Sequence, residues 1–173
     1  DAAVVVAHDG NDSFQIGGAP TSIDGGDGED TITRFILSTL VSQPSGNPIE
    51  QVATNGVIVD LGAGQIIDDG FGNSGTLTSI EHVGGSALDD ALTGSSVSNT
   101  LTGFEGNDIL NGGGGVDTAI MNLTGAEVSF TRNVAGQWIV TSAEGVDTLT
   151  SVEQLTFADG SIALDNAQRT FFG

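Results

Sequence analysis

A nine-residue period constrains the fold more than any other feature of this sequence. Residues 85–120 divide without a gap into the nonapeptides GSALDDALT, GSSVSNTLT, GFEGNDILN and GGGGVDTAI. Residues 7–33 hold three more units in register, AHDGNDSFQ, IGGAPTSID and GGDGEDTIT. Position six carries an oxygen-bearing side chain and position eight an apolar one in every unit. Enrichment in glycine would not produce this pattern, so the period indicates a repeat architecture.

The unit GGDGEDTIT matches the nonapeptide G-G-x-G-x-D-x-U-x, with U large and apolar, at every specified position. The chain therefore resembles the repeats-in-toxin (RTX) family of haemolysin-type calcium-binding proteins. GFEGNDILN departs only at the second glycine, whereas GGGGVDTAI has the small Ala119 at position eight. The resemblance implies an all-β fold, a right-handed parallel β-roll (solenoid) with flanking and capping strands. We expect one domain, 1–173, with repeat blocks 7–33 and 85–120, intervening strands 34–84 and a C-terminal β cap 121–173.

The physics of the unit agrees with this resemblance. Six glycine-rich residues form a tight turn and three form a short strand, so two units, or 18 residues, complete one coil. Loops on one edge then lie 18 residues apart. This spacing stacks the position-six residues in three pairs: Asp12 over Asp30, Asp90 over Asp108, and Asn99 over Asp117. If these residues were ordinary turn formers, nothing would predict the 18-residue pairing.

Each stacked pair of loops can supply oxygen ligands to Ca²⁺, which takes about six to eight of them. The family resemblance implies that backbone carbonyls of the first four loop positions contribute as well, here Gly25, Asp27, Gly103, Glu105, Gly112 and Gly114. We expect about three to five ions. The loop ending at Thr21 lacks a carboxylate and is expected to be empty or weak. Asn99 offers a neutral oxygen, so its site is expected to bind less tightly.

The charge balance excludes several partners and makes calcium decisive. Three basic residues stand against 23 acidic ones, a net charge of −20. This leaves too few cationic contacts for nucleic acid or an anionic membrane surface. Without an ion, a stacked carboxylate pair at ~4 Å costs on the order of 4 kcal/mol at an effective dielectric of ~20. We therefore expect a chain that is loose at low calcium and folds at extracellular calcium.

The segments outside the repeats read as strands and turns. RFILSTLV (34–41) is a strand candidate, and 57–68 reads as a hairpin about Gly62–Gly64. GTLTSIEHV (75–83) reappears as DTLTSVEQL (147–155), which predicts a duplicated strand with His82 as a structural polar residue. Two strands around Val134–Gly136 and a turn at Asp159–Gly160 are expected to cap the roll. Trp138 is expected to belong to the core of this cap.

The favoured function is a non-catalytic calcium-binding module of a secreted, extracellular bacterial protein. The resemblance implies type I secretion, folding on Ca²⁺ outside the cell, and support for a neighbouring domain of the same polypeptide. The alternative is an adhesion or glycan-binding module of a cell-surface or biofilm protein, with a polysaccharide as partner. We expect no enzymatic activity, since no catalytic or cofactor-binding constellation is visible. The full-length protein could still carry an attached enzyme.

Overall fold

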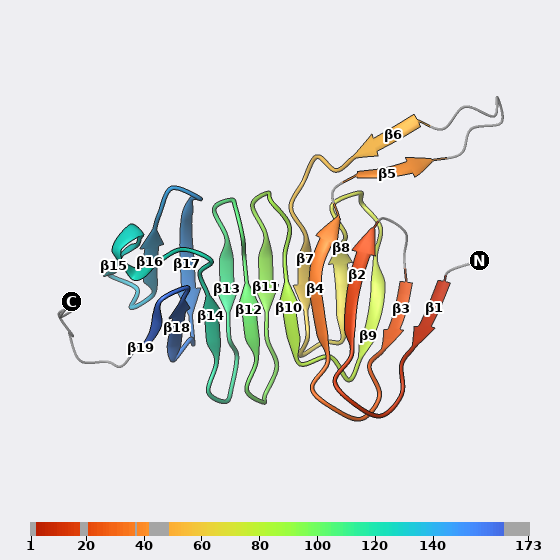
Figure 1. The fold of residues 1–173 in the computed structure, drawn as a ribbon, viewed down its shortest axis with the longest axis horizontal. Helices are drawn as coiled ribbons and strands as arrows, with labels where there is room; N and C mark the ends of the chain where they lie inside the picture. The colour runs from red at the N-terminus through yellow and green to blue at the C-terminus, as the bar shows by residue number, and fades with distance from the viewer. Residues whose placement is uncertain (1–2, 18–20, 37, 42–48, 165–173) are drawn as a thin grey trace.

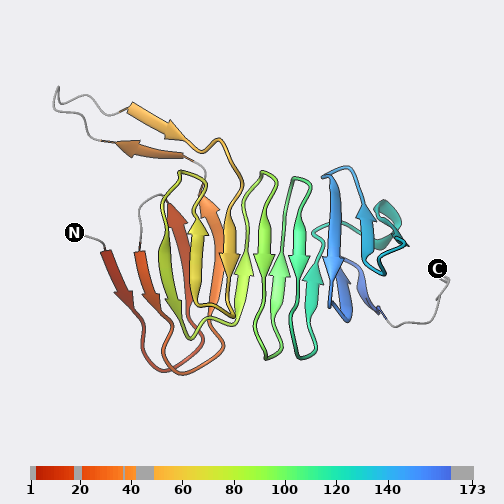
Figure 2. The same ribbon diagram turned by 180° about the vertical axis from the view of Figure 1, so that it is seen from behind.

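The computed structural model describes residues 3–17, 21–36, 38–41 and 49–164. This part of the chain is all-β apart from one 3₁₀ turn at Gly125–Glu127. The search of these residues for a helix long and apolar enough to cross a membrane found none. The strands build an elongated roll with two long sheets and a separate hairpin (Figures 1 and 2).

The first long sheet contains ten strands. Their spatial order is β1 (Ala3–Val6), β3 (Thr21–Asp24), β9 (Gly75–Thr78), β8 (Gln65–Asp68), β7 (Ile58–Asp60), β11 (Ala91–Thr93), β13 (Ile109–Asn111), β17 (Val146–Thr150), β16 (Trp138–Thr141) and β15 (Ser129–Arg132). The second long sheet has the order β19 (Gly160–Ala163), β18 (Gln154–Phe157), β14 (Thr118–Ile120), β12 (Thr100–Thr102), β10 (His82–Gly84), β4 (Thr31–Ile36) and β2 (Ser13–Gly17). Strands β5 (Ser38–Val41) and β6 (Ile49–Val52) pair only with each other.

The repeats alternate between the two long sheets, which confirms the parallel β-roll. Ala91 pairs with Ile109 in the first sheet, and Thr100 pairs with Thr118 in the second. Both pairings are parallel and join residues 18 positions apart. One coil therefore contains two nonapeptides, one for each sheet, as the period requires.

Both repeat blocks contribute strands to the same sheets. Strand β4 of the first block pairs in parallel with β10, which pairs in turn with β12 of the second block. The intervening segment supplies the antiparallel β7–β8 hairpin about Gly62–Gly64, as expected. The strand expected at 34–41 is divided instead: residues to Ile36 continue β4 in the roll, whereas β5 pairs with β6 outside it. The turn residues 42–48 lie outside the described part.

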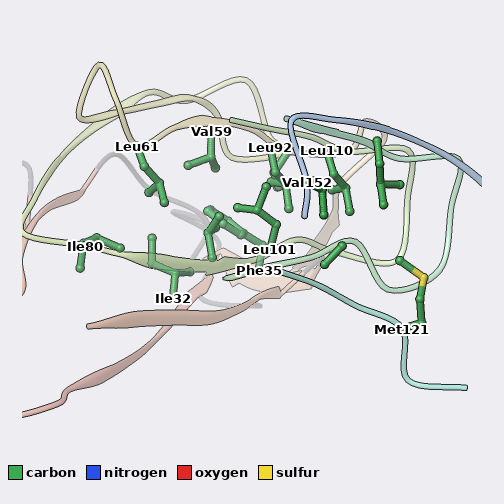
Figure 3. Packing of buried hydrophobic residues seen from close by; sticks show 14 of the residues in the cluster. Ile32, Phe35, Val59, Leu61, Ile80, Leu92, Leu101, Leu110, Met121 and Val152 are labelled. Atoms are coloured by element: carbon green, nitrogen blue, oxygen red, sulfur yellow. The ribbon is translucent and has the colours of Figure 1, made fainter. Parts of the chain in front are cut away.

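The core is a column of position-eight side chains that points between the sheets (Figure 3). Leu92, Leu101 and Leu110 are at most 1% exposed, and Ala119 is fully buried at the equivalent position. Because each coil contributes only two such side chains, the column is thin. The roll thus depends on its loops as well as on its apolar core.

Antiparallel strands close the C-terminal end. Strands β16 and β15 extend the first sheet beyond β17, and β19 extends the second beyond β18. Trp138 meets Phe130 edge-to-face, with ring centroids 5.9 Å apart, and both pack against the core. Trp138 therefore belongs to the packing of the cap.

Candidate metal centre

The glycine-rich loops lie in two rows, one along each edge of the roll. The first edge carries the loops 7–12, 25–30, 94–99 and 112–117, and the second edge carries 85–90 and 103–108. Within each repeat block, a loop packs on the loop one coil further along. The position-six side chains are therefore neighbours across successive coils.

The three pairs expected from the 18-residue spacing are brought together by one recurring hydrogen bond. The backbone N–H of the earlier residue donates to Oδ1 of the later aspartate. The donor–acceptor distances are 2.7 Å for Asp12 to Asp30, 2.9 Å for Asp90 to Asp108, and 2.8 Å for Asn99 to Asp117. This bond uses one oxygen of each later carboxylate and leaves the other to find a partner elsewhere.

In three loops that second oxygen has no partner within the described structure. Oδ2 of Asp30, Asp108 and Asp117 is buried and accepts no hydrogen bond, and the three residues are at most 1% exposed. A buried carboxylate oxygen without a partner is costly, because it loses its water without compensation. A bound cation would remove this cost, so the residues present fit a metal that prefers oxygen ligands, such as Ca²⁺.

Side chains alone do not complete a metal site. Within the described residues, no three His, Asp or Glu side chains converge on one point. The remaining ligands would therefore have to be backbone carbonyls or water, both of which Ca²⁺ accepts. The carbonyl donors implied by the family resemblance all lie in the same three loops, at Gly25, Asp27, Gly103, Glu105, Gly112 and Gly114.

The backbone at position two distinguishes two kinds of loop. Gly26, Phe104 and Gly113 have φ values of 93°, 73° and 91°. We call their loops, 25–30, 103–108 and 112–117, the open loops, because these contain the unpaired oxygens. Phe104 holds this conformation without being glycine, at a steric cost. The missing second glycine in GFEGNDILN therefore leaves the shape of the loop unchanged.

Serine at position two satisfies the position-six side chain from within the loop. Ser86 donates its N–H to Oδ2 of Asp90 at 2.6 Å and its hydroxyl to Oδ1 at 2.7 Å. Ser95 donates in the same way to Oδ1 of Asn99, at 2.6 Å and 3.2 Å. We call 85–90 and 94–99 the closed loops. Their position-six oxygens already have protein donors, so a metal ion would have to compete with them.

Sequence reasoning missed two acidic residues that extend the row on the first edge. Glu81 accepts the N–H of Asp30, and Glu153 accepts the N–H of Asp117, each at 2.9 Å. Both belong to the duplicated segment, which forms a short turn in place of a six-residue loop. The duplication was visible in the sequence, but the role of its glutamate was not. His82 follows the first copy, and its Nδ1 accepts the N–H of Thr100 at 3.0 Å.

Sequence reasoning also missed Asp147 on the second edge. Its Oδ1 accepts the N–H of Asp108 at 3.0 Å, and the residue is only 6% exposed. Burial raises the pKa of Asp108 to about 8, and the nearby carboxylates of Asp147 and Asp90 add to the rise. Burial likewise raises the pKa of Asp147 to about 6. The second edge thus concentrates desolvated acidic groups that a cation would stabilise in their charged form.

Comparison with known families agrees with this geometry. Residues 84–119 match the RTX calcium-binding nonapeptide repeat in four copies. The matched segment contains the closed loops and the two open loops at 103–108 and 112–117. The loops at 7–12 and 25–30 lie outside it, as does Asp147. No curated protein sequence matches the chain.

Proposed function

We propose that the chain is a non-catalytic calcium module of a secreted bacterial protein, because residues 84–119 match the RTX calcium-binding nonapeptide repeat. In this role it folds on meeting Ca²⁺ outside the cell. The folded module supports type I export and the stability of a neighbouring domain. The observation that carries this proposal is the set of three buried, unpaired carboxylate oxygens in the open loops.

The open loops would provide the strongest ligands. Asp30, Asp108 and Asp117 would bind Ca²⁺ through Oδ2, because their Oδ1 atoms are held by backbone N–H groups. Asp12, Asp90 and Asn99 would face the same ions from the preceding coil. Carbonyls of the open loops would complete the shell, and the expected number stays at about three to five ions. When bound, the ion supplies the positive charge that these desolvated carboxylates lack.

Calcium-dependent folding follows because the repulsion between acidic groups is large relative to the stabilisation from the apolar core. The chain has a formal net charge of −20, and the roll has a thin apolar column. Extracellular calcium modules bind with a Kd of ~10⁻⁴–10⁻³ M. At free calcium about tenfold above Kd, each site adds roughly 1.4 kcal/mol to the stability of the folded state. The stabilisation from several sites together is comparable with the free energy of unfolding of a small domain.

Adhesion or glycan binding is the second candidate and would use the same roll as a rigid scaffold. Trp138 is the residue to examine, since its ring lies beside a hollow in the cap. The guanidinium of Arg132 covers this ring at 5.2 Å from the centroid, and Phe130 meets its edge. These contacts favour a packing role for Trp138, so the calcium module remains the preferred function.

A calcium titration followed by far-UV circular dichroism tests the proposal, with Mg²⁺ as control. We expect β signal to appear cooperatively between micromolar and millimolar Ca²⁺, while Mg²⁺ has little effect. Asp108→Ala should shift the midpoint to higher calcium. A chain already folded in EDTA and indifferent to calcium would overturn the proposal and favour a preformed scaffold for adhesion.

A further inference from the structure

A β-bulge in strand β4 turns the side chain of Arg34 away from the core. In the pairing of β4 with β2, the register shifts by one residue at Thr33, which has no residue opposite it. Ile32 and Phe35 are both buried, at 0% and 1% exposed, although they lie three positions apart. A regular strand alternates its faces and would place Arg34 in the core beside Ile32. The bulge instead brings Arg34 to the outer face of the second sheet.

The guanidinium of Arg34 reaches the open loop 103–108. Its Nη2 lies 3.5 Å from Oε2 of Glu105, and its Cζ lies over the ring of Phe104, 4.8 Å from the centroid. Phe104 and Glu105 are positions two and three of this loop. A Cβ built at Gly84 would lie 3.0 Å from the same ring, so the glycine leaves the ring its space. The strand that continues the first repeat block thus contacts a loop of the second block through one side chain.

Phe104 is the position-two residue of the open loops for which such a contact matters most. Its φ of 73° is costly for a residue with a Cβ, whereas Gly26 and Gly113 adopt the same region without that cost. Within the described part of the chain, the other arginine is Arg132, which lies over Trp138 in the cap. The arginine of the roll therefore lies on the open loop whose position two is not glycine.

The conformation of Phe104 affects the direction of the expected ligands. The carbonyls of Gly103 and Glu105, which the family resemblance implies as ligands, lie on either side of it. The φ of Phe104 is one of the torsions that set the direction of one carbonyl relative to the other. A change to the negative φ that side chains prefer would turn them apart. The guanidinium opposes this change, because the change would break its contact with the ring.

The charge of Arg34 and its contact with the ring predict opposite effects on calcium affinity. A guanidinium near a bound cation repels it, so the charge alone would weaken binding. Glu105 lies beside this guanidinium and offsets its charge. The two side chains are 43% and 55% exposed, so water and salt screen the charge that remains. We therefore expect the effect on loop conformation to dominate.

We propose that Arg34 is a positioning residue for calcium binding, whose guanidinium holds Phe104 in the glycine-like conformation of loop 103–108. This inference rests on the proposed calcium function and assigns a role to a residue outside the matched segment 84–119. Because Arg34 belongs to β4, calcium binding at this loop also stabilises the contact between the two repeat blocks. Binding on the second edge is thereby coupled to the first block.

Isothermal titration calorimetry of the full chain with Ca²⁺ tests this role through a double-mutant cycle. Arg34→Ala removes the guanidinium, and Phe104→Gly removes the need for it. We expect Arg34→Ala to weaken the binding of one ion about two- to fivefold, as loss of an exposed cation–π contact would. In the Phe104→Gly chain, Arg34→Ala should leave every affinity unchanged. Arg132→Ala is the matched control and should bind as wild type does, since its guanidinium also covers an aromatic ring, at 5.2 Å, but in the cap.

The outcomes separate this inference from the proposed function. If the wild-type chain binds no Ca²⁺, the proposed function fails and this inference fails with it. If wild type binds calcium and Arg34→Ala binds it as tightly or more tightly, only the inference is overturned. Equal weakening in the wild-type and Phe104→Gly chains would also overturn it, because the effect would not pass through Phe104. Far-UV circular dichroism at saturating calcium reports folding, and an Arg34→Ala chain that stays unfolded there would assign Arg34 a structural role and overturn the inference.

Discussion

Ser79 and Ser151 share one unusual backbone conformation, with φ values of 50° and 49°. They stand at equivalent positions of the duplicated segment, and the carbonyl of each lies against a position-one glycine, Gly25 or Gly112. The same three-residue turn therefore follows an open loop at two places in the roll. In each case its glutamate continues the row of carboxylates, while the turn itself omits the glycine-rich loop.

Adding a methyl group at Gly112 should disrupt this junction. A Cβ there would overlap the carbonyl of Ser151 and the carboxylate of Asp117, and backbone cannot move aside as a side chain can. We expect Gly112→Ala to destabilise the calcium-bound protein by about 3 kcal/mol, measured by urea unfolding. Gly136→Ala is the comparison, because Gly136 has φ 84° but no neighbour within 4 Å of a Cβ. It should cost only the conformational strain, about 1–2 kcal/mol, and equal losses would contradict the steric argument.

Phe104 should tolerate glycine better than alanine. Its φ of 73° is strained for any residue with a Cβ. Its ring carries the guanidinium of Arg34 at 4.8 Å from the centroid. Both substitutions lose that contact, but only Phe104→Gly relieves the strain. We expect Phe104→Gly to be more stable than Phe104→Ala by about 1 kcal/mol in calcium, measured by chemical denaturation. An alanine variant as stable as the glycine variant would show that the positive φ is not maintained.

Removing the Ser86 hydroxyl should weaken the closed loop. Ser86 is fully buried, and its hydroxyl donates to Asp90. Ser86→Ala should destabilise the calcium-bound protein by about 1–3 kcal/mol, because a buried carboxylate loses a donor. Ser98 also makes a bond between loops, to Val116 N–H at 3.1 Å, but it is exposed. Ser98→Ala should therefore change stability by less than about 0.5 kcal/mol. Thermal unfolding of both variants at saturating calcium makes the comparison.

The calcium-free protein should be more stable in mild acid than in mild alkali. Burial raises the pKa of Asp108 to about 8 and that of Asp147 to about 6, from the ordinary value of 3.8. The folded state therefore binds protons that the unfolded state has released. The folded state is therefore destabilised as the pH rises through these raised pKa values. We expect far-UV circular dichroism to show more residual β signal at pH 5 than at pH 8 after calcium is removed by dialysis.

Saturating calcium should reverse this pH dependence. The ion binds the deprotonated carboxylates, so raising the pH removes competing protons and tightens binding. Asp108→Asn removes the group with the higher pKa and should flatten the calcium-free profile. A calcium-free β signal that rises between pH 5 and pH 8 would show that these carboxylates are already ionised in the folded state.

The repeat period was sufficient to predict the roll, because position eight fixes which side chains enter the core. Leu92 and Leu110 pair in one sheet, and Leu101 and Ala119 pair in the other. The 18-residue stacking of position-six residues follows from the same arithmetic. The conformation of each loop was harder to predict from the sequence. The glycine-like φ of Phe104 depends on three-dimensional contacts, and so does the closing of its loop by Ser86. The amino-acid sequence alone does not show these contacts.

Asp147 was missed for a more specific reason. Its unit, 142–150, lacks the first two glycines and lies outside both repeat blocks, so the nine-residue period does not reveal it. A signal was present, since Gly-Val-Asp-Thr occurs at 115–118 and again at 145–148. The register became evident only when Thr148 was seen to donate to Asp108 as Thr31 does to Asp12. The role of Glu81 was hidden in the same way, because a shortened turn breaks the nine-residue count.

The 18-residue coil also sets how the module responds to being pulled. Each folded coil advances the roll by one strand spacing, ~4.8 Å, whereas the same residues fully extended reach ~60 Å. Because a coil bonds mainly to the coils on either side, traction at one end peels away one coil at a time. Each step would release more than ten times the length that it removes from the roll. Within the nonapeptide repeats, tension would therefore release the stored chain in equal increments.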